Sequence, residues 1–182
     1  TPYDEIVQRL LTSREGEDAQ ATQMFYSATG GSPDAYANSV TRVFLGVRVG
    51  CAQCHPHPFA DWDQDDFWGM AAFFVNALPA AGPPTQSAQT EPTPIATITY
   101  DGATYAAKYL WDEQSAQLED EITPTDALAQ WMTAKGNPTF AETGVNRVWQ
   151  HLLGRGLVAD PDELDLASPE ERTTVLGELA AM

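Results

Sequence analysis

Apolar residues recur with helical spacing in three segments of the first half of the chain, and each segment opens with residues that favour a helix start. Thr1-Pro2 opens the first segment, Ser32-Pro33-Asp34 opens the second, and acidic residues at 61–66 open the third. Gly50 follows the second run and is predicted to end that helix just before Cys51. The three apolar stripes are Ile6, Val7, Leu10 and Leu11; Val40, Val43, Phe44 and Val47; and Phe67, Met70, Ala71 and Phe74.

The middle of the chain changes character. Residues 79–94 combine several prolines with Gly, Ser, Thr and Gln, a composition that predicts a loop. Residues 95–100 then alternate, Asp101-Gly102 is the signal of a type I′ turn, and the residues up to 109 provide a returning strand. We therefore predict a small β-hairpin over 95–109. It must pack on the helices, because a lone hairpin is only marginally stable in water.

Helical spacing returns over residues 123–182. Thr123-Pro124 starts one predicted helix, Asn137-Pro138 starts the next, and a capping box at 168–171 starts the last. Gly136 is the predicted C-cap of the first, and Gly154 and Gly156 close the second. The apolar faces are Leu128, Trp131 and Met132; Val145, Val148, Trp149 and Leu152; and Val175, Leu176 and Leu179.

These patterns predict a mainly α fold, a compact helical domain over residues 1–182 with one small β-hairpin inserted. The hairpin separates a first half, 1–78, from a second helical half, 123–182. No stretch reaches the roughly 18 apolar residues that a membrane-spanning helix needs.

Charge narrows the range of partners. Nine Lys and Arg stand against 26 Asp and Glu among 182 residues, a formal net charge of -17. Nucleic acid and anionic membrane surfaces are therefore poor partners, because both need a basic surface. Acidic clusters at 61–66 and 160–165 are interpreted as solvated helix starts, and the alternative is that they dock a basic redox partner protein.

Both cysteines lie in the motif Cys51-Ala52-Gln53-Cys54-His55. On helical backbone, thiols three residues apart point to the same side, and His55, four residues from Cys51, leans over the same patch. This geometry suits a porphyrin held by two thioether bonds, with its iron bound by the adjacent imidazole. Cys-x-x-Cys-His is accordingly the attachment signature of c-type haem. We predict one covalent haem c, with His55 as the proximal iron ligand.

Three other interpretations of the motif stay open. The first is that its members are ordinary core residues. The second is a zinc site, in which Cys51, Cys54 and His55 or His57 need a fourth ligand, for which His151 is the candidate. The third is a thioredoxin-type dithiol, which needs a βαβ setting that the helical pattern before Cys51 does not offer. Residues 51–57 hold both cysteines and two of the three histidines, which favours haem.

The sixth iron ligand is a separate question. His57 is two residues from His55 and is predicted to shape the loop or to bond near a propionate. His151 is the candidate distal ligand or distal-pocket residue, because it is the remaining imidazole. Met70 is a weaker alternative, since a methionine at helical spacing is more often core. An open or water-ligated position is the third possibility.

Aromatic residues follow the cysteine motif closely. Most are predicted to be core, and some are candidates for the apolar wall of a haem pocket. They are Phe59, Trp62, Phe67, Trp68, Phe73 and Phe74.

Two longer motifs resemble a known family. Residues 43–59 read VFLGVRVGCAQCHPHPF, and residues 146–158 read NRVWQHLLGRGLV. In this order they resemble the planctomycete-type cytochrome c-associated proteins, with their paired domains of unknown function. The resemblance covers about residues 1–78 and 124–182. Members are usually much longer, with a large insert where this chain has a short loop and a hairpin.

The resemblance implies haem attachment at Cys51, Cys54 and His55, and export from the cytoplasm. We infer from it that the second half closes the haem pocket from the distal side, with Arg147, Trp149 and His151 as further cofactor-binding residues. The positions that match the second motif are Asn146, Arg147, Trp149, His151 and Arg155.

Three functional hypotheses follow. The first is a c-type cytochrome that transfers electrons in the periplasm or elsewhere outside the cytoplasm, because bacteria complete covalent haem attachment beyond the inner membrane. The second is a haem enzyme or a gas- or peroxide-binding protein with an open distal site, where His151 or Arg147 acts as acid-base or hydrogen-bond donor. The third is a structural zinc module.

Overall fold

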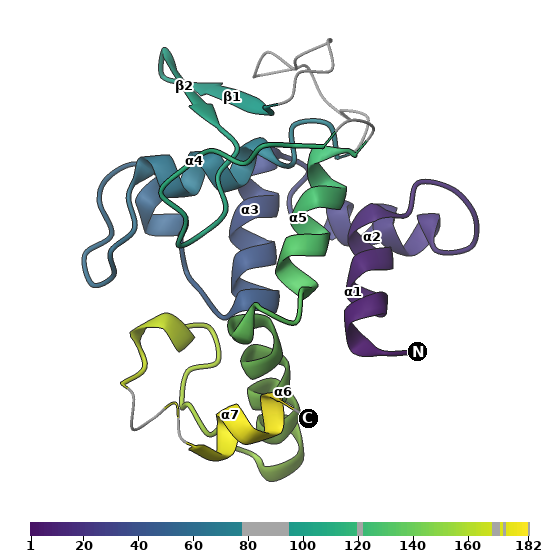
Figure 1. The fold of residues 1–182 in the computed structure, drawn as a ribbon, viewed down its shortest axis with the longest axis vertical. Coiled ribbons are helices and arrows are strands. Elements are labelled where there is room, and N and C mark those ends of the chain that lie inside the picture. Colours follow the sequence, from purple (N-terminus) through teal and green to yellow (C-terminus); the bar gives the residue numbers. More distant parts are fainter. Residues whose placement is uncertain (78–94, 120–121, 169–171, 173, 182) are drawn as a thin grey trace.

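The computed structural model describes residues 1–77, 95–119, 122–168, 172 and 174–181. Within these ranges the chain is mainly α-helical with one small antiparallel hairpin, as predicted (Figure 1). The predicted loop at 79–94 lies outside the described residues, as does most of the predicted capping box at 168–171.

The N-terminal part of the fold consists of helices and a π-helical turn. The elements are α1 (Tyr3–Thr12), α2 (Ala19–Ala28), α3 (Pro33–Val40) and the turn η1 (Thr41–Leu45), which continues α3. Helix α1 buries Val7 and Leu11 of its predicted stripe. Helix α2 was not predicted, because its large apolar residues are three consecutive ones, Met24 to Tyr26, and give no helical stripe.

The helix predicted to run to Gly50 ends earlier. Gly46 has a φ of +64°, and its N–H donates to the carbonyl of Thr41, which ends η1 at Leu45. Residues 46–49 lead to a separate 3-10 turn, η2 (Gly50–Gln53), which contains Cys51. The cysteine motif is therefore held apart from α3 by a left-handed glycine.

Helix α4 (Gln64–Ala72) starts in the predicted acidic segment. The Asp63 carboxylate accepts from the Asp66 N–H at 3.1 Å, and the Asp66 carboxylate accepts from the Asp63 N–H at 2.9 Å, which makes a reciprocal cap. All residues from Phe67 to Ala72 are buried, so α4 contributes a continuous segment to the core.

The hairpin packs on α4, as predicted, and this packing stabilises a two-stranded sheet that would be only marginally stable alone in water. Strand β1 (Thr97–Tyr100) pairs with β2 (Ala103–Ala106), and Asp101 and Gly102 both have positive φ, as a type I′ turn requires. The chain after β2 crosses α4 at Gly69, whose carbonyl accepts from the Lys108 N–H at 3.2 Å. A Cβ on Gly69 would lie 2.8 Å from that of Lys108, so the crossing needs glycine.

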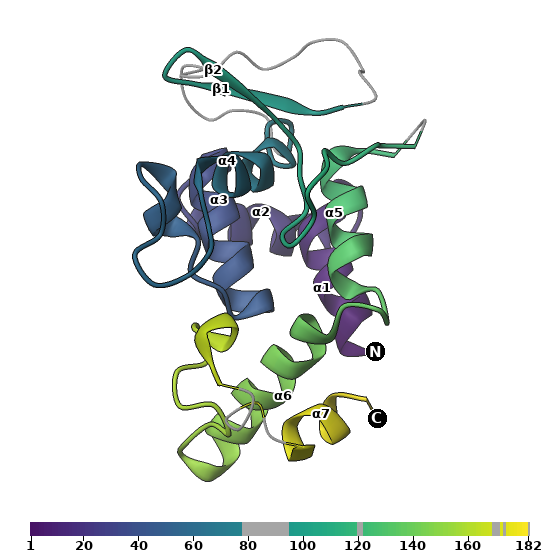
Figure 2. The ribbon, with the colours of Figure 1, turned by 60° about the vertical axis from the view of Figure 1, so that its left-hand side comes forward.

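The C-terminal elements are α5 (Pro124–Thr133), α6 (Pro138–Leu153), the 3-10 turn η3 (Leu164–Leu166) and α7 (Thr174–Ala180). The Thr123 hydroxyl accepts from the Asp126 N–H at 3.2 Å, and Gly154 closes α6 at a φ of +80°. Both agree with prediction, whereas α5 ends at Thr133, before the predicted cap Gly136. Figures 1 and 2 show α6 running away from α4 toward α7, at the opposite end of the molecule.

The described residues form two apolar clusters that stabilise the fold. The larger one joins α1 to α5 and includes Tyr26, Phe67, Trp68, Phe74 and Leu128. The smaller one is formed by Val158, Leu164 and Leu176, beneath α6. None of the helices in the described ranges is long and apolar enough to cross a membrane.

The predicted apolar face of α6 is confirmed at Val145, which packs against the smaller cluster, and is wrong at Val148 and Leu152. Val148 and Leu152 are 60% and 72% exposed, whereas Thr143 and Asn146 are buried. The reason is that hydrogen bonds from Asn146 and Arg147 to other segments fix the rotation of the helix, and these bonds turn the apolar stripe outward.

Candidate functional site

The 3-10 turn η2 presents both cysteines to solvent. Cys51 and Cys54 are free thiols and both are exposed. Cys51 lies within the turn, and Cys54 directly follows its last residue, Gln53. The backbone at Cys51 is a 3-10 turn rather than an α-helix, and the shared side of the two thiols stays a prediction.

The turn is anchored to α4 from its buried side. The carbonyl of Gln53 accepts hydrogen bonds from the Trp68 indole and from the Gln64 amide, each at 3.2 Å. Ala52 is completely buried. Because the residues between the cysteines are held by the core, the thiols keep their outward orientation.

The ring of His55 is oriented by its neighbour. Its Nδ1 lies 2.8 Å from the carbonyl oxygen of Pro56. A carbonyl only accepts, so Nδ1 must carry the hydrogen. In the neutral imidazole, Nε2 is then the atom with a free lone pair, and the side chain is exposed. This contact leaves Nε2 of the predicted proximal ligand available to a metal.

His57 shapes the loop, as predicted. The ring Nδ1 accepts from the backbone N–H groups of Phe59 and Ala60, at 3.3 and 2.9 Å. The backbone N–H of His57 donates to the Trp62 carbonyl at 2.8 Å. The ring therefore holds the turn after His55 and has its Nδ1 occupied.

Most of the aromatic residues that follow the motif are core. Phe67, Trp68, Phe73 and Phe74 are each at most 1% exposed, and the neighbouring Met70 is fully buried. None of these five is open to solvent beside the cysteines. Phe59 differs, because it is 82% exposed in the loop after His55.

The structure does not bring His151 or Trp149 to the cysteine turn. Both lie in the C-terminal part of α6, which packs on η1 and α7, whereas η2 packs on α4. His151 is exposed in the last turn of α6. Helix α6 does not close over His55 in this arrangement.

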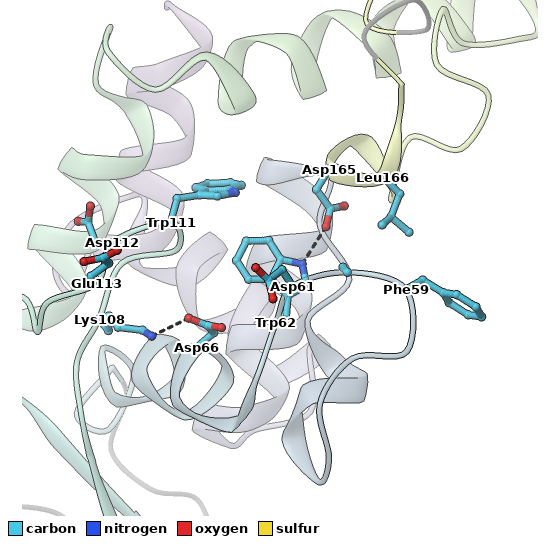
Figure 3. A pocket seen from close by; sticks show the side chains of 11 residues that line it. Phe59, Asp61, Trp62, Asp66, Lys108, Trp111, Asp112, Glu113, Asp165 and Leu166 are labelled. Atoms are coloured by element: carbon cyan, nitrogen blue, oxygen red, sulfur yellow. Dashed lines mark hydrogen bonds and ion pairs between the residues drawn. The ribbon is translucent and has the colours of Figure 1, made fainter.

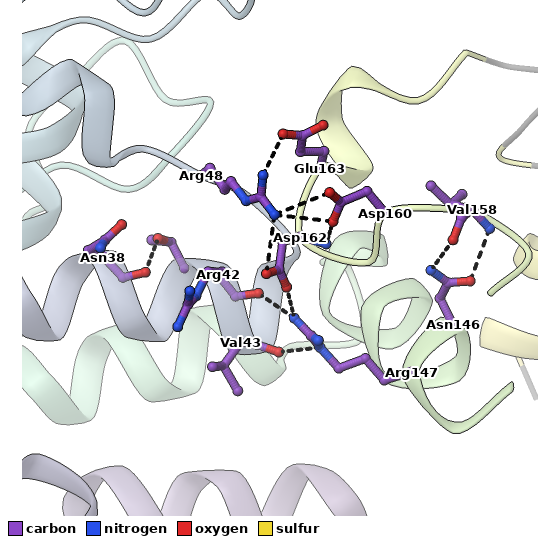
Figure 4. Close-up of polar contacts among 11 residues, drawn as sticks. Asn38, Arg42, Val43, Arg48, Asn146, Arg147, Val158, Asp160, Asp162 and Glu163 are labelled. Carbon is purple, nitrogen blue, oxygen red and sulfur yellow. Dashed lines mark hydrogen bonds and ion pairs between the residues drawn. The ribbon is translucent and has the colours of Figure 1, made fainter. Parts of the chain in front are cut away.

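Arg147 joins the two halves of the chain. Its Nε donates to the Val43 carbonyl at 3.0 Å, and its Nη2 donates to the Arg42 carbonyl at 2.7 Å and to the Asp162 carboxylate at 2.6 Å (Figure 4). The guanidinium predicted as a cofactor contact is thus directed to the backbone of η1.

Asn146 explains the second motif. Its amide donates to the Val158 carbonyl and accepts from the Val158 N–H, both at 3.0 Å, and it is completely buried. A Cβ on Gly156 would lie 2.3 Å from the Val158 carbonyl oxygen and 2.8 Å from the Asn146 Oδ1. The two bonds from the Asn146 side chain to the Val158 backbone therefore close the segment 146–158 into a loop, which explains the spacing of these two residues in the motif.

The acidic segment 160–165 is not simply solvated, which corrects the sequence interpretation. Arg48 donates to Glu163 at 2.7 Å and to Asp160 at 3.1 Å, and lies 3.6 Å from Asp162. Desolvation lowers the pKa of Arg48, but these carboxylates more than compensate and raise it overall. A second link is the Trp62 indole, which donates to Asp165 at 2.8 Å. Sequence analysis missed both, because no local signal pairs residues more than 100 positions apart.

The zinc interpretation needs a cluster of ligands. Across the part of the chain that the structure describes, no group of three or more His, Cys, Asp or Glu side chains is placed to hold a metal ion.

Two protein families match this chain, both described as proteins of unknown function. The first, DUF1549, matches residues 1–78, and the second, DUF1553, matches residues 125–181. Among curated proteins and among solved structures, nothing matches the chain. Residues 1–78 and 125–181 are therefore similar, in this order, to two domains of unknown function.

Proposed function

We propose that this chain binds one haem c covalently through Cys51 and Cys54, with His55 as the proximal iron ligand, and transfers electrons outside the cytoplasm. The haem, when bound, supplies one-electron chemistry at its iron. The compartment belongs to the same proposal, because bacteria complete this covalent attachment beyond the inner membrane.

The orientation of His55 carries the proposal. A hydrogen bond from Nδ1 to a carbonyl fixes which nitrogen is left for a metal, and metal-bound histidines generally make such a bond. This imidazole directly follows two exposed free thiols in a turn that α4 holds in place. Two thiols and one free ring nitrogen are the donor set that a c-type haem requires.

The remaining residues of the turn have a positioning role. Gln53 keeps the turn on α4 through its carbonyl, and His57 holds the loop that follows His55. Because both contacts use groups other than the thiols and the His55 ring, they leave the attachment residues free.

The proposal is tested by measuring whether haem is covalently attached to the chain. The chain is produced with an export signal in a bacterium that has cytochrome c maturation machinery. The purified protein is then denatured, and its mass is measured by mass spectrometry. We expect the mass of the chain plus one haem, and a reduced visible spectrum typical of c-type haem. The variant Cys51→Ser/Cys54→Ser is expected to have the mass of the bare chain. A wild-type protein with the bare mass under the same conditions would refute the proposal.

A second candidate function is a haem protein with an exchangeable sixth position. The observation that favours it is the position of the two predicted sixth ligands, since Met70 is buried in the core and His151 lies on α6, away from η2. Binding of carbon monoxide to the reduced protein without loss of a protein ligand supports this function. A low-spin, six-coordinate ferric spectrum that His151→Ala changes supports the simple electron carrier with His151 as ligand.

A further inference from the structure

An open pocket of about 570 Å³ lies beside the loop that follows the cysteine motif. Three segments that are far apart in the sequence form it together with Asp66 of α4: the loop 59–62, the segment 108–113 after the hairpin, and residues 165–166 (Figure 3). Neither the thiols nor His55 line it. Its chemistry is therefore independent of the proposed haem attachment.

Two indole rings form a corner of this pocket. The centroids of Trp62 and Trp111 are 5.6 Å apart and their planes meet at 68°. Trp62 is 7% exposed and its ring is fixed by the bond to Asp165, whereas Trp111 is 49% exposed. Trp111 also has a φ of +67°, a backbone conformation that a bulky residue rarely adopts. The chain thus holds a large ring at a position where glycine is usual.

Carboxylates dominate the charge of the pocket. Lys108, the basic residue of its lining, is paired with Asp66 at 2.6 Å. Asp165 accepts from Trp62, and the side chains of Asp61, Asp112 and Glu113 make no ion pair within the described part of the chain. With Lys108 neutralised, the lining keeps an excess of negative charge, which repels anions.

We propose that this pocket binds an organic ammonium cation, with the cation against the Trp62–Trp111 corner and the carboxylates around it. Indole faces attract cations through their quadrupole, and perpendicular aromatic walls are the usual way to hold an alkylated ammonium group. Negative charge at the rim adds long-range attraction. A neutral sugar could stack on the indole rings, but the carboxylates would add no electrostatic attraction to its binding. The same chemistry has two sources, a free quaternary ammonium compound or a lysine side chain of a partner protein.

The experiment is ligand-observed saturation-transfer-difference NMR on the full chain. The probes are choline, its neutral analogue 3,3-dimethyl-1-butanol, and N-acetyl-lysine amide, at equal concentration and ionic strength. We expect saturable transfer to at least one cation and much weaker transfer to the neutral analogue. Stronger binding of choline identifies a free ammonium ligand, and stronger binding of the lysine amide identifies a partner's side chain.

Two variants separate the pocket from general effects. Trp111→Gly removes one wall and suits the positive φ, so the chain is expected to fold while cation affinity falls about tenfold. Asp61→Asn/Asp112→Asn/Glu113→Gln is expected to lower the affinity by a similar factor. The matched control Asp4→Asn/Glu17→Gln/Glu178→Gln removes the same charge outside the pocket and is expected to bind as wild type. Equal binding of the neutral analogue, no binding of either cation, or unchanged binding by the pocket triple variant would overturn the proposal.

Discussion

Two histidines two residues apart have different roles here, and the difference lies in what faces Nδ1. The Nδ1 of His55 faces a carbonyl and donates, whereas the Nδ1 of His57 faces two N–H groups and accepts. The sequence predicted a loop role for His57, which its contacts confirm, and a ligand role for His55, which stays a prediction. It did not give the tautomers, because these depend on backbone atoms that only the folded loop places.

The contacts of His57 predict a stability effect. His57→Leu leaves the N–H groups of Phe59 and Ala60 without their acceptor, which is expected to cost about 1 kcal/mol. His57→Asn keeps an acceptor near the same place and is expected to lose less. Urea unfolding of the two variants measures this, and equal losses would show that the loop does not depend on the ring's acceptor.

Tyr26 predicts how stability changes at high pH. Its hydroxyl is buried and donates to the Leu11 carbonyl at 3.0 Å. Burial raises the pKa of Tyr26 well above the ordinary value of 10.0, and Tyr36 raises it further. The unfolded phenol therefore loses its proton at a lower pH than the folded one. Stability is retained below the unfolded pKa and falls above it, by up to about 1.4 kcal/mol per pH unit.

The variant Tyr26→Phe separates this effect from others. The phenylalanine side chain at position 26 cannot ionise. The unfolding free energy of this variant is therefore expected to fall less steeply above pH of about 10 than that of the wild type. Some slope remains, because burial also raises the pKa of Tyr36 and Tyr109. Urea unfolding across the alkaline range measures the slopes, and identical slopes would contradict the assignment to Tyr26.

At the scale of elements, capping and turn signals predicted most of the boundaries. Asp63, Thr123 and Gly154 act as caps, and Asp101-Gly102 makes the hairpin turn. These signals are local, so the sequence contains them. The end of η1 and the buried face of α6 were not predicted, because contacts between the two halves determine them.

Gly46 is the clearest case of such a contact. A Cβ at this position would lie 2.9 Å from the Pro161 carbonyl and from the Thr143 hydroxyl, and the backbone is left-handed. Gly46→Ala is therefore expected to cost about 3 kcal/mol. Gly102→Ala has a similar positive φ but open space, and is expected to cost only about 1 kcal/mol. Thermal unfolding compares them, and similar losses would mean that the close approach at Gly46 is unimportant.

At the scale of the whole molecule, the two matched families do not correspond to two separate cores. Helix α1 belongs to the first matched range and α5 to the second, yet they pack together in the larger cluster. Within the described residues, only the region below α6 has a cluster of its own. The fold class was predictable from helical spacing. The division of the core into a larger and a smaller cluster was not predictable, because it depends on packing between residues far apart in the sequence.

Arg147 and Arg48 both join the two halves, and they are expected to contribute differently to the free energy of unfolding. Arg147 bonds two backbone carbonyls and Asp162, so Arg147→Leu leaves several partners unsatisfied and is expected to cost about 2 kcal/mol. Arg48 makes exposed ion pairs, so Arg48→Leu is expected to cost below about 1 kcal/mol, and less in high salt.

Lysine variants of the same two arginines test whether Arg147 acts at a distance from the cysteine turn. Arg147 lies against η1, which ends before Gly46, whereas η2 is held by α4. If haem is attached as proposed, Arg147→Lys is expected to lower stability and leave the visible spectrum of the protein unchanged. A distal residue would behave differently, because removing its hydrogen bond alters the spin state or the ligand affinity of the iron. A spectrum that changes in Arg147→Lys but not in Arg48→Lys would therefore place α6 next to the haem and contradict the separation seen between α6 and η2.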